Sequence, residues 1–198
     1  MNLFAGFALS ILLAAPAEED GLTQAKALYL KAVQGDHAAA VQAQASFKRL
    51  METSSDDAVL LAYSGSLQVL QSGHTLALWK KGRLAKQGLS SLDTAVSRAP
   101  ENPEVRFLRA ISTVHLPGMF RREDQCSADL AWLAARANTA VASGALDRRY
   151  AALALYHHGE TEQKHGRSAQ AIAAWNEAVK IAPDSRGGVD AARRLHSR

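Results

Sequence analysis

The segment of this chain that is most informative about the fold is His158-Gly-Glu-Thr-Glu-Gln-Lys-His-Gly-Arg-Ser-Ala-Gln-Ala-Ile-Ala-Ala-Trp-Asn-Glu-Ala-Val-Lys-Ile-Ala-Pro183. Small residues, one large aromatic residue and a closing proline stand in it at spacings of 7, 5, 4, 3 and 5 residues: Gly159, Gly166, Ala171, Trp175, Ala178 and Pro183. Small residues let paired helices approach closely, and the aromatic side chain fills the gap to the next pair. Pro183 cannot continue a helix. The segment therefore predicts two helices that meet at a turn around Gly166.

The rest of the chain has the same helical character. It has 198 residues, of which 47% are hydrophobic and 6% aromatic, as in a folded globular protein. Hydrophobic residues recur at steps of three and four, without the alternation that is typical of strands. The single cysteine excludes an intramolecular disulfide and a four-cysteine zinc site. We therefore predict an all-α protein.

Glycine, serine and proline clusters divide the chain into helical hairpins. Breaks fall near Gly35, Gly73, Pro100 and Gly144. We expect one helical repeat domain over residues 18–198, with antiparallel hairpins at about 22–53, 56–98, 103–142 and 147–182 and a capping helix at 186–197.

The segment from Gly159 to Pro183 resembles the tetratricopeptide repeat (TPR). Two other segments carry parts of the same spacing: Ala128, Trp132 and Ala135, and Leu92, Ala95 and Pro100. Two features depart from the family pattern: Glu162 replaces an aromatic residue, and the period is about 40 residues instead of roughly 34. The resemblance implies stacked hairpins in a right-handed superhelix, an α-solenoid, whose concave face holds a peptide or helix of a partner.

The N-terminus predicts export. Residues 1–17 contain no charged side chain, end in the small residues Ala15-Pro16-Ala17 and precede three acidic residues. This pattern is typical of a signal peptide that is cut after Ala17, and it places the protein in a bacterial periplasm. An uncleaved hydrophobic anchor is the alternative, although the apolar run of roughly 13 residues is shorter than the ~20 that cross a bilayer. No later segment is apolar for long enough to span a membrane after cleavage.

Catalytic signatures are missing: the chain has no serine elbow, phosphate-binding loop or dinucleotide fingerprint. We expect no enzyme, cofactor or metal. The alternative is an enzyme, or an accessory protein that binds a metal or small ligand, built on His157, His158 and His165, which share one predicted helix with Glu162.

Clustered cations suggest a binding surface. The formal net charge is +4. Two groups stand out: Trp79, Lys80, Lys81 and Arg83, and then Arg106, Arg109, Arg121 and Arg122. Together they are expected to form a basic groove that binds an acidic peptide segment, or an anionic glycan or lipid head group. The alternative is that Arg106 and Arg109 pair with Glu104 and Glu123 and that the lysines only solvate a helix. Nucleic acid is a poor partner for an exported protein.

The turn around Met119 and Phe120 has two interpretations. An exposed apolar pair would contact a partner, whereas a buried pair would fill the gap between hairpins. Taken together, the sequence predicts a non-catalytic protein–protein interaction or assembly module of the periplasm. Homo-oligomerisation through an open repeat end is a further possibility.

Overall fold

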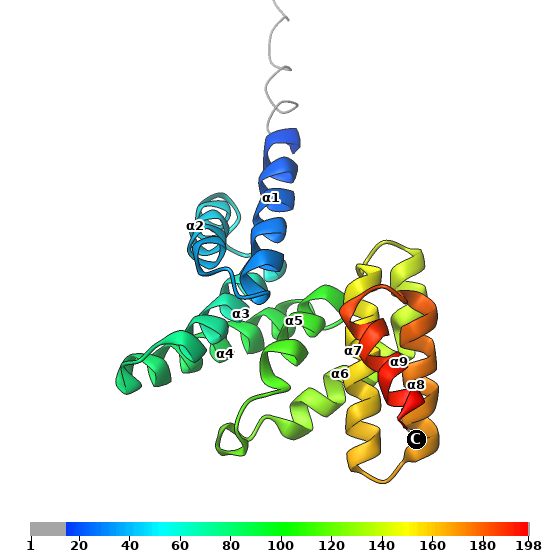
Figure 1. Cartoon of the computed structure of the whole chain (residues 1–198). Helices are drawn as coiled ribbons and strands as arrows, with labels where there is room; N and C mark the ends of the chain where they lie inside the picture. The colour runs from blue at the N-terminus through cyan, green and yellow to red at the C-terminus, as the bar shows by residue number, and fades with distance from the viewer. Residues whose placement is uncertain (1–14, 198) are drawn as a thin grey trace, which may run out of the picture.

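The structure, a computed structural model, is all-helical over the residues that it describes, 15–197 (Figure 1). Its helices are α1 (Ala15–Val33), α2 (His37–Thr53), α3 (Ala58–His74), α4 (Leu78–Arg98), α5 (Pro103–Thr113), the short 3-10 helix η1 (Gly118–Phe120), α6 (Glu123–Ala142), α7 (Arg148–Lys164), α8 (Ser168–Ile181) and α9 (Arg186–His196). No strand occurs within these residues, which confirms the all-α prediction. None of the described helices is sufficiently long and apolar to cross a membrane.

The predicted signal peptide falls mainly outside the described residues. Only its last three positions, Ala15 to Ala17, belong to α1. Cleavage after Ala17 stays a prediction.

Several helices begin at the polar residues that suit a helix start. The side chains of Asp36, Asp57, Asn102, Asp147 and Ser185 accept hydrogen bonds from backbone amides in the first turns of α2, α3, α5, α7 and α9. Such caps satisfy donors that have no partner within the helix, and each stabilises the helix by about 1 kcal/mol. Local sequence thus positions these helix starts before any tertiary contact forms.

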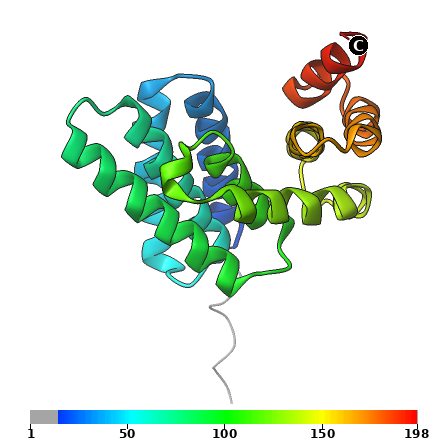
Figure 2. The same cartoon turned by 90° about the horizontal axis from the view of Figure 1, so that it is seen from below.

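Neighbouring helices pack in pairs along the chain. The helices of each pair α1–α2, α3–α4 and α7–α8 lie against each other, and α9 covers parts of α7 and α8. Helix α6 contacts α5 at one side and α7 at the other, and thereby joins the first five helices to the last three (Figures 1 and 2). A TPR-like superhelix remains a prediction.

Glycines permit the closest helix contacts. A Cβ atom at Gly88 would lie 2.5 Å from the carbonyl oxygen of Gly65, so the backbones of α3 and α4 touch. A Cβ at Gly159 would lie 2.4 Å from Nε1 of Trp175, which is 1% exposed. The small residue and the aromatic residue of the 158–183 segment therefore pack directly on each other within the α7–α8 pair.

The triplet Ala128, Trp132 and Ala135 has a different environment. Both alanines are exposed, while Trp132 is half-buried between the guanidinium groups of Arg106 and Arg136, which lie 4.6 and 4.2 Å from its ring centroid. Ala171, Trp175 and Ala178 are all buried instead. Equal spacing therefore does not give equal packing in the two segments.

A tyrosine cluster joins the first helices to α5. The ring of Tyr63 stacks on Phe47 and meets Tyr29 edge to face. Its hydroxyl donates a 2.6 Å hydrogen bond to Glu104, which also accepts from Lys26. Because Tyr63 is fully buried, this bond satisfies a polar group that would otherwise be costly to bury.

Candidate partner-binding groove

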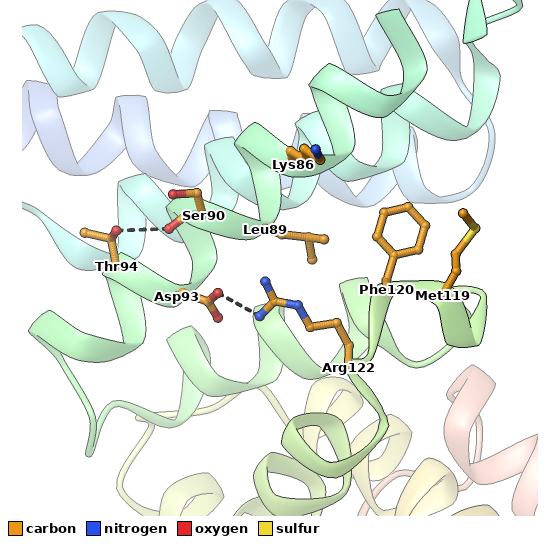
Figure 3. Close-up of a pocket in the computed structure, with 8 residues that line it drawn as sticks. All are labelled: Lys86, Leu89, Ser90, Asp93, Thr94, Met119, Phe120 and Arg122. Carbon is orange, nitrogen blue, oxygen red and sulfur yellow. Dashed lines mark hydrogen bonds and ion pairs between the residues drawn. The ribbon is translucent and has the colours of Figure 1, made fainter. Parts of the chain in front are cut away.

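A groove lies between α4 and the segment that follows α5. It encloses about 470 Å³, and eight residues line it: Lys86, Leu89, Ser90, Asp93, Thr94, Met119, Phe120 and Arg122 (Figure 3). Phe120 and Met119 lie at one end, while Arg122 points toward Asp93 at the other (Figure 3). The groove therefore offers an apolar end and a charged end.

The sharp turn of η1 presents the apolar side chains. Arg121 adopts the left-handed conformation, with φ of 51°, and its backbone amide donates to the carbonyl of Gly118. This conformation reverses the chain immediately after Phe120. Met119 is 84% exposed, and Phe120 is partly buried against the core. The interpretation of a buried plug is therefore wrong for Met119, whereas Phe120 partly fills that role.

Hydrogen bonds hold the charged end of the groove in place. Asp93 accepts from Arg122 at 2.7 Å, from the side-chain amide of Gln125 at 2.9 Å and from Arg109 at 3.4 Å. The Arg122 guanidinium also donates to Gln125. These hydrogen bonds thereby link the three helices α4, α5 and α6 at the charged end of the groove.

A buried ion-pair cluster lies next to the charged end of the groove. Asp129 is completely buried, and its carboxylate accepts from Arg106 at 2.7 Å and from Arg109 at 2.7 and 2.9 Å. Arg106 and Arg109 are thus engaged by α6, and their acidic partners are neither Glu104 nor Glu123. Removing one member of such a cluster leaves a buried charge without compensation, which is strongly destabilising.

The structure distributes the basic residues of the sequence prediction over several places. Trp79, Lys80, Lys81 and Arg83 are exposed at the start of α4. Arg106 and Arg109 surround Asp129, and Arg121 is exposed beside the groove. Of these eight residues, Arg122 is the one that lines the groove in the part of the chain that the structure describes. Lys86, which follows the first group along α4, lines the groove as well.

The three histidines face different neighbours. His157 is buried and its ring lies 5.3 Å from that of His115. Burial, and then the charge of His115, lower the pKa of His157 to about 4. Burial also lowers the pKa of His158, and His165 contacts Arg167 through Nδ1 at 3.1 Å.

Glu162, which shares their helix, pairs with Arg167. Its carboxylate accepts hydrogen bonds from Arg167, and this interaction lowers the pKa of Glu162. Within residues 15–197, no group of three histidine, cysteine or acidic side chains converges as metal ligands would.

Cys126 lies on the inner face of α6. Burial raises the pKa of its thiol, and Sγ lies 3.5 Å from the carbonyl oxygen of Ala110. A thiol with a raised pKa is a poor nucleophile, because the thiolate is the reactive form.

The most important residue that the sequence analysis missed is Asp129. It lies on the helix face that also carries Cys126, Leu130 and Leu133, all of which are buried. An acidic residue on an apolar helix face indicates a buried ion pair, so the sequence contained a usable signal. For Leu89, Ser90 and Thr94, which line the groove, the sequence contains no comparable signal.

Comparisons with known proteins find no matching family model, no matching curated protein and no matching solved structure.

Proposed function

We propose that this protein is a non-catalytic interaction module and that it holds a segment of a partner protein in the groove between α4 and residues 119–122. The observation that carries this proposal is the exposure of Met119, 84%, at the rim of a groove of about 470 Å³. A single exposed apolar residue is ordinary on a protein surface, but Met119 lines this groove together with Leu89 and Phe120, and methionine adapts its shape to different partners.

The chemistry of the groove suggests which partner segment fits. Leu89, Met119 and Phe120 would bury an apolar side chain of the partner. Within residues 15–197, no ion pair includes Lys86, whereas Arg122 is already paired with Asp93. An acidic residue near the apolar one would therefore pair with Lys86. The proposed ligand is a short acidic and apolar segment of a protein.

Two further features of the proposal come from the sequence. The apolar run before Ala17 and the small residues that end it support export to a bacterial periplasm. The contact of Gly159 with Trp175 packs α7 and α8 into a tight hairpin, which is the unit that the proposed TPR-like array would stack. Stacked hairpins present a surface on which a partner peptide could bind without any catalytic residue.

Site-specific photo-crosslinking in living cells tests the groove. A photoreactive amino acid at position 119 of the full chain should capture one protein, while the same amino acid at the exposed position 173 on α8 should not. In the position-119 background, Lys86→Glu should abolish the crosslink by repelling an acidic segment. Lys48→Glu, the same charge change on the exposed face of α2, should leave it intact. Capture that is identical at both positions, or that survives Lys86→Glu, would contradict the proposal.

A further inference from the structure

The connection between α3 and α4 exposes two large apolar side chains at an outer end of the molecule. Both views place this connection at the periphery, away from α7–α9 (Figures 1 and 2). Leu76 is 97% exposed and Trp79 is 72% exposed. We call Leu76, Trp79, Lys80, Lys81 and Arg83 the α3–α4 tip. Isolated apolar residues are common on protein surfaces, but a leucine and a tryptophan of this exposure only three residues apart in the chain indicate a contact site.

Along the chain, the charge on either side of the α3–α4 tip has a single sign. Between Asp57 and Asp93 the chain contains no acidic residue, and its four cations all fall on the first half of α4: Lys80, Lys81, Arg83 and Lys86. The described residues include no ion pair to Lys80, Lys81 or Arg83, whose guanidinium lies 5.5 Å from the ring centroid of Trp79. These cations therefore remain available to an anionic surface.

The order of the side chains along α4 matches the layers of a lipid bilayer. Leu76 and Trp79 come first, and Arg83 follows Trp79 by four residues, or ~6 Å at a rise of 1.5 Å per residue. The head-group layer of a bilayer is roughly 5–8 Å thick on each side. If the end of α4 meets a membrane, Leu76 and Trp79 would reach the acyl boundary while Arg83 lies among the phosphates. Lys80 and Lys81 directly follow Trp79, and their long side chains would extend their charges to the same layer.

We propose that the α3–α4 tip docks on the surface of an anionic lipid bilayer. Tryptophan favours the membrane interface because its ring is apolar and its N–H is polar. The apolar residues stand on a projecting end, whereas a protein helix or peptide is usually held in a groove. This site is separate from the groove at Met119, so the two proposals stand or fall independently.

Binding of the full chain to lipid vesicles tests the proposal. The vesicles contain equal parts of phosphatidylcholine and phosphatidylglycerol, and a second set contains phosphatidylcholine alone. Brominated acyl chains report insertion, because they quench a nearby tryptophan. The anionic vesicles should quench the fluorescence, and Trp79→Phe should remove this quenching, since Trp175 is buried and Trp132 is packed between two arginines. The apolar N-terminal residues are the same in all variants, so a difference between the variants does not come from them.

Two double variants with equal charge changes distinguish binding through the α3–α4 tip from nonspecific electrostatic attraction between a basic protein and an anionic membrane. Lys80→Gln with Lys81→Gln should weaken binding roughly 30-fold, because each cation near an anionic surface contributes a factor of about five. Lys31→Gln with Lys48→Gln alters exposed lysines on α1 and α2 and should change binding less than threefold. Circular dichroism confirms that both variants are folded.

The outcomes are distinct. The proposal is supported if quenching of Trp79 requires phosphatidylglycerol and is lost when Lys80→Gln is combined with Lys81→Gln. Equal loss in both double variants, or no quenching of Trp79, overturns it. A response of Trp79 to polyglutamate but not to vesicles also overturns it, and assigns the tip to an acidic protein instead.

Discussion

At the scale of single residues, Asp129 is the charge on which the α5–α6 contact depends most. Asp129→Ala would leave the guanidinium groups of Arg106 and Arg109 half-buried without their shared partner. We expect the free energy of unfolding to fall by about 3–5 kcal/mol, measured by urea denaturation. Asp124→Ala, at an exposed position in the first turn of the same helix, should cost less than about 1 kcal/mol. Equal losses in the two variants would show that the buried cluster around Asp129 contributes no more to the free energy of unfolding than an exposed charge does.

A second residue-scale prediction concerns His157 and pH. Its pKa is about 4 in the folded protein, below the ordinary value of 6.5. Between these values the unfolded chain binds a proton that the folded chain does not bind, so stability falls as the pH drops from 6.5 toward 4. His115 in the turn after α5, Arg186 on α9 and Lys164 on α7 all disfavour the protonated imidazole.

His157→Phe should remove this part of the pH dependence. Relative to the variant, the wild-type protein should lose about 3 kcal/mol between pH 7 and pH 4, at ~1.4 kcal/mol per unit of pKa shift. Urea denaturation of both proteins at each pH gives the difference. Stability curves that run parallel from pH 7 to pH 4 would rule out burial of a neutral His157.

At the scale of elements, two glycines of α4 have opposite roles. A Cβ at Gly82 would meet nothing within 4 Å, whereas a Cβ at Gly88 would lie 2.5 Å from the backbone of Gly65. Gly82→Ala should stabilise the protein by up to about 1 kcal/mol through helix propensity. Gly88→Ala should destabilise it by about 1–3 kcal/mol by forcing α3 and α4 apart. Thermal unfolding followed by circular dichroism compares them, and shifts of the same sign would contradict the close contact of the two helices.

At the scale of the whole molecule, α9 closes the C-terminal end of the helical array. A Cβ at Gly187 would lie 2.4 Å from the backbone nitrogen of Leu153, so α9 rests directly on α7. Gly187→Ala should displace α9 and lower stability by about 1–3 kcal/mol, because the backbone of α7 cannot give way. The displaced helix would also expose apolar surface of α7 and α8, and we expect a mass that rises with concentration in light scattering.

Arg186→Ala is the matched control for that change. Arg186 is exposed and neighbours Gly187 in the same helical turn, so its replacement should alter stability by no more than about 0.5 kcal/mol. If Gly187→Ala has the melting temperature and mass of the control, α9 does not cap the array.

Much of the helical architecture could be predicted because its signals are local. Periodicity of three and four residues is encoded within each helix, and the breaks at Gly35, Gly144 and Gly166 have positive φ values of 101°, 75° and 75°. Pro103 at the start of α5 suits a position without a hydrogen-bonded amide. Each of these features depends on neighbours within about one helical turn, so no knowledge of the tertiary fold was needed.

The candidate groove could not be predicted in the same way. It combines Lys86 and Leu89 on α4 with Met119 and Phe120 in η1, after α5, and these residues come together only in the folded chain. The sequence predicts that Arg106 and Arg109 line a surface or pair with nearby glutamates. Asp129, which lies 20 residues or more along the chain, is their partner instead.

The sequence by itself determined that this protein is helical, where many of its turns lie, and that residues 58–92 carry positive charge alone. These properties follow from side-chain type and from spacing along one helix. Only the tertiary structure decided which cations within residues 15–197 remain without an ion pair, at the α3–α4 tip, and which form ion pairs with Asp129 and Asp93. The physical reason is that an ion pair forms over a few ångströms in space, and folding determines which distant residues come that close.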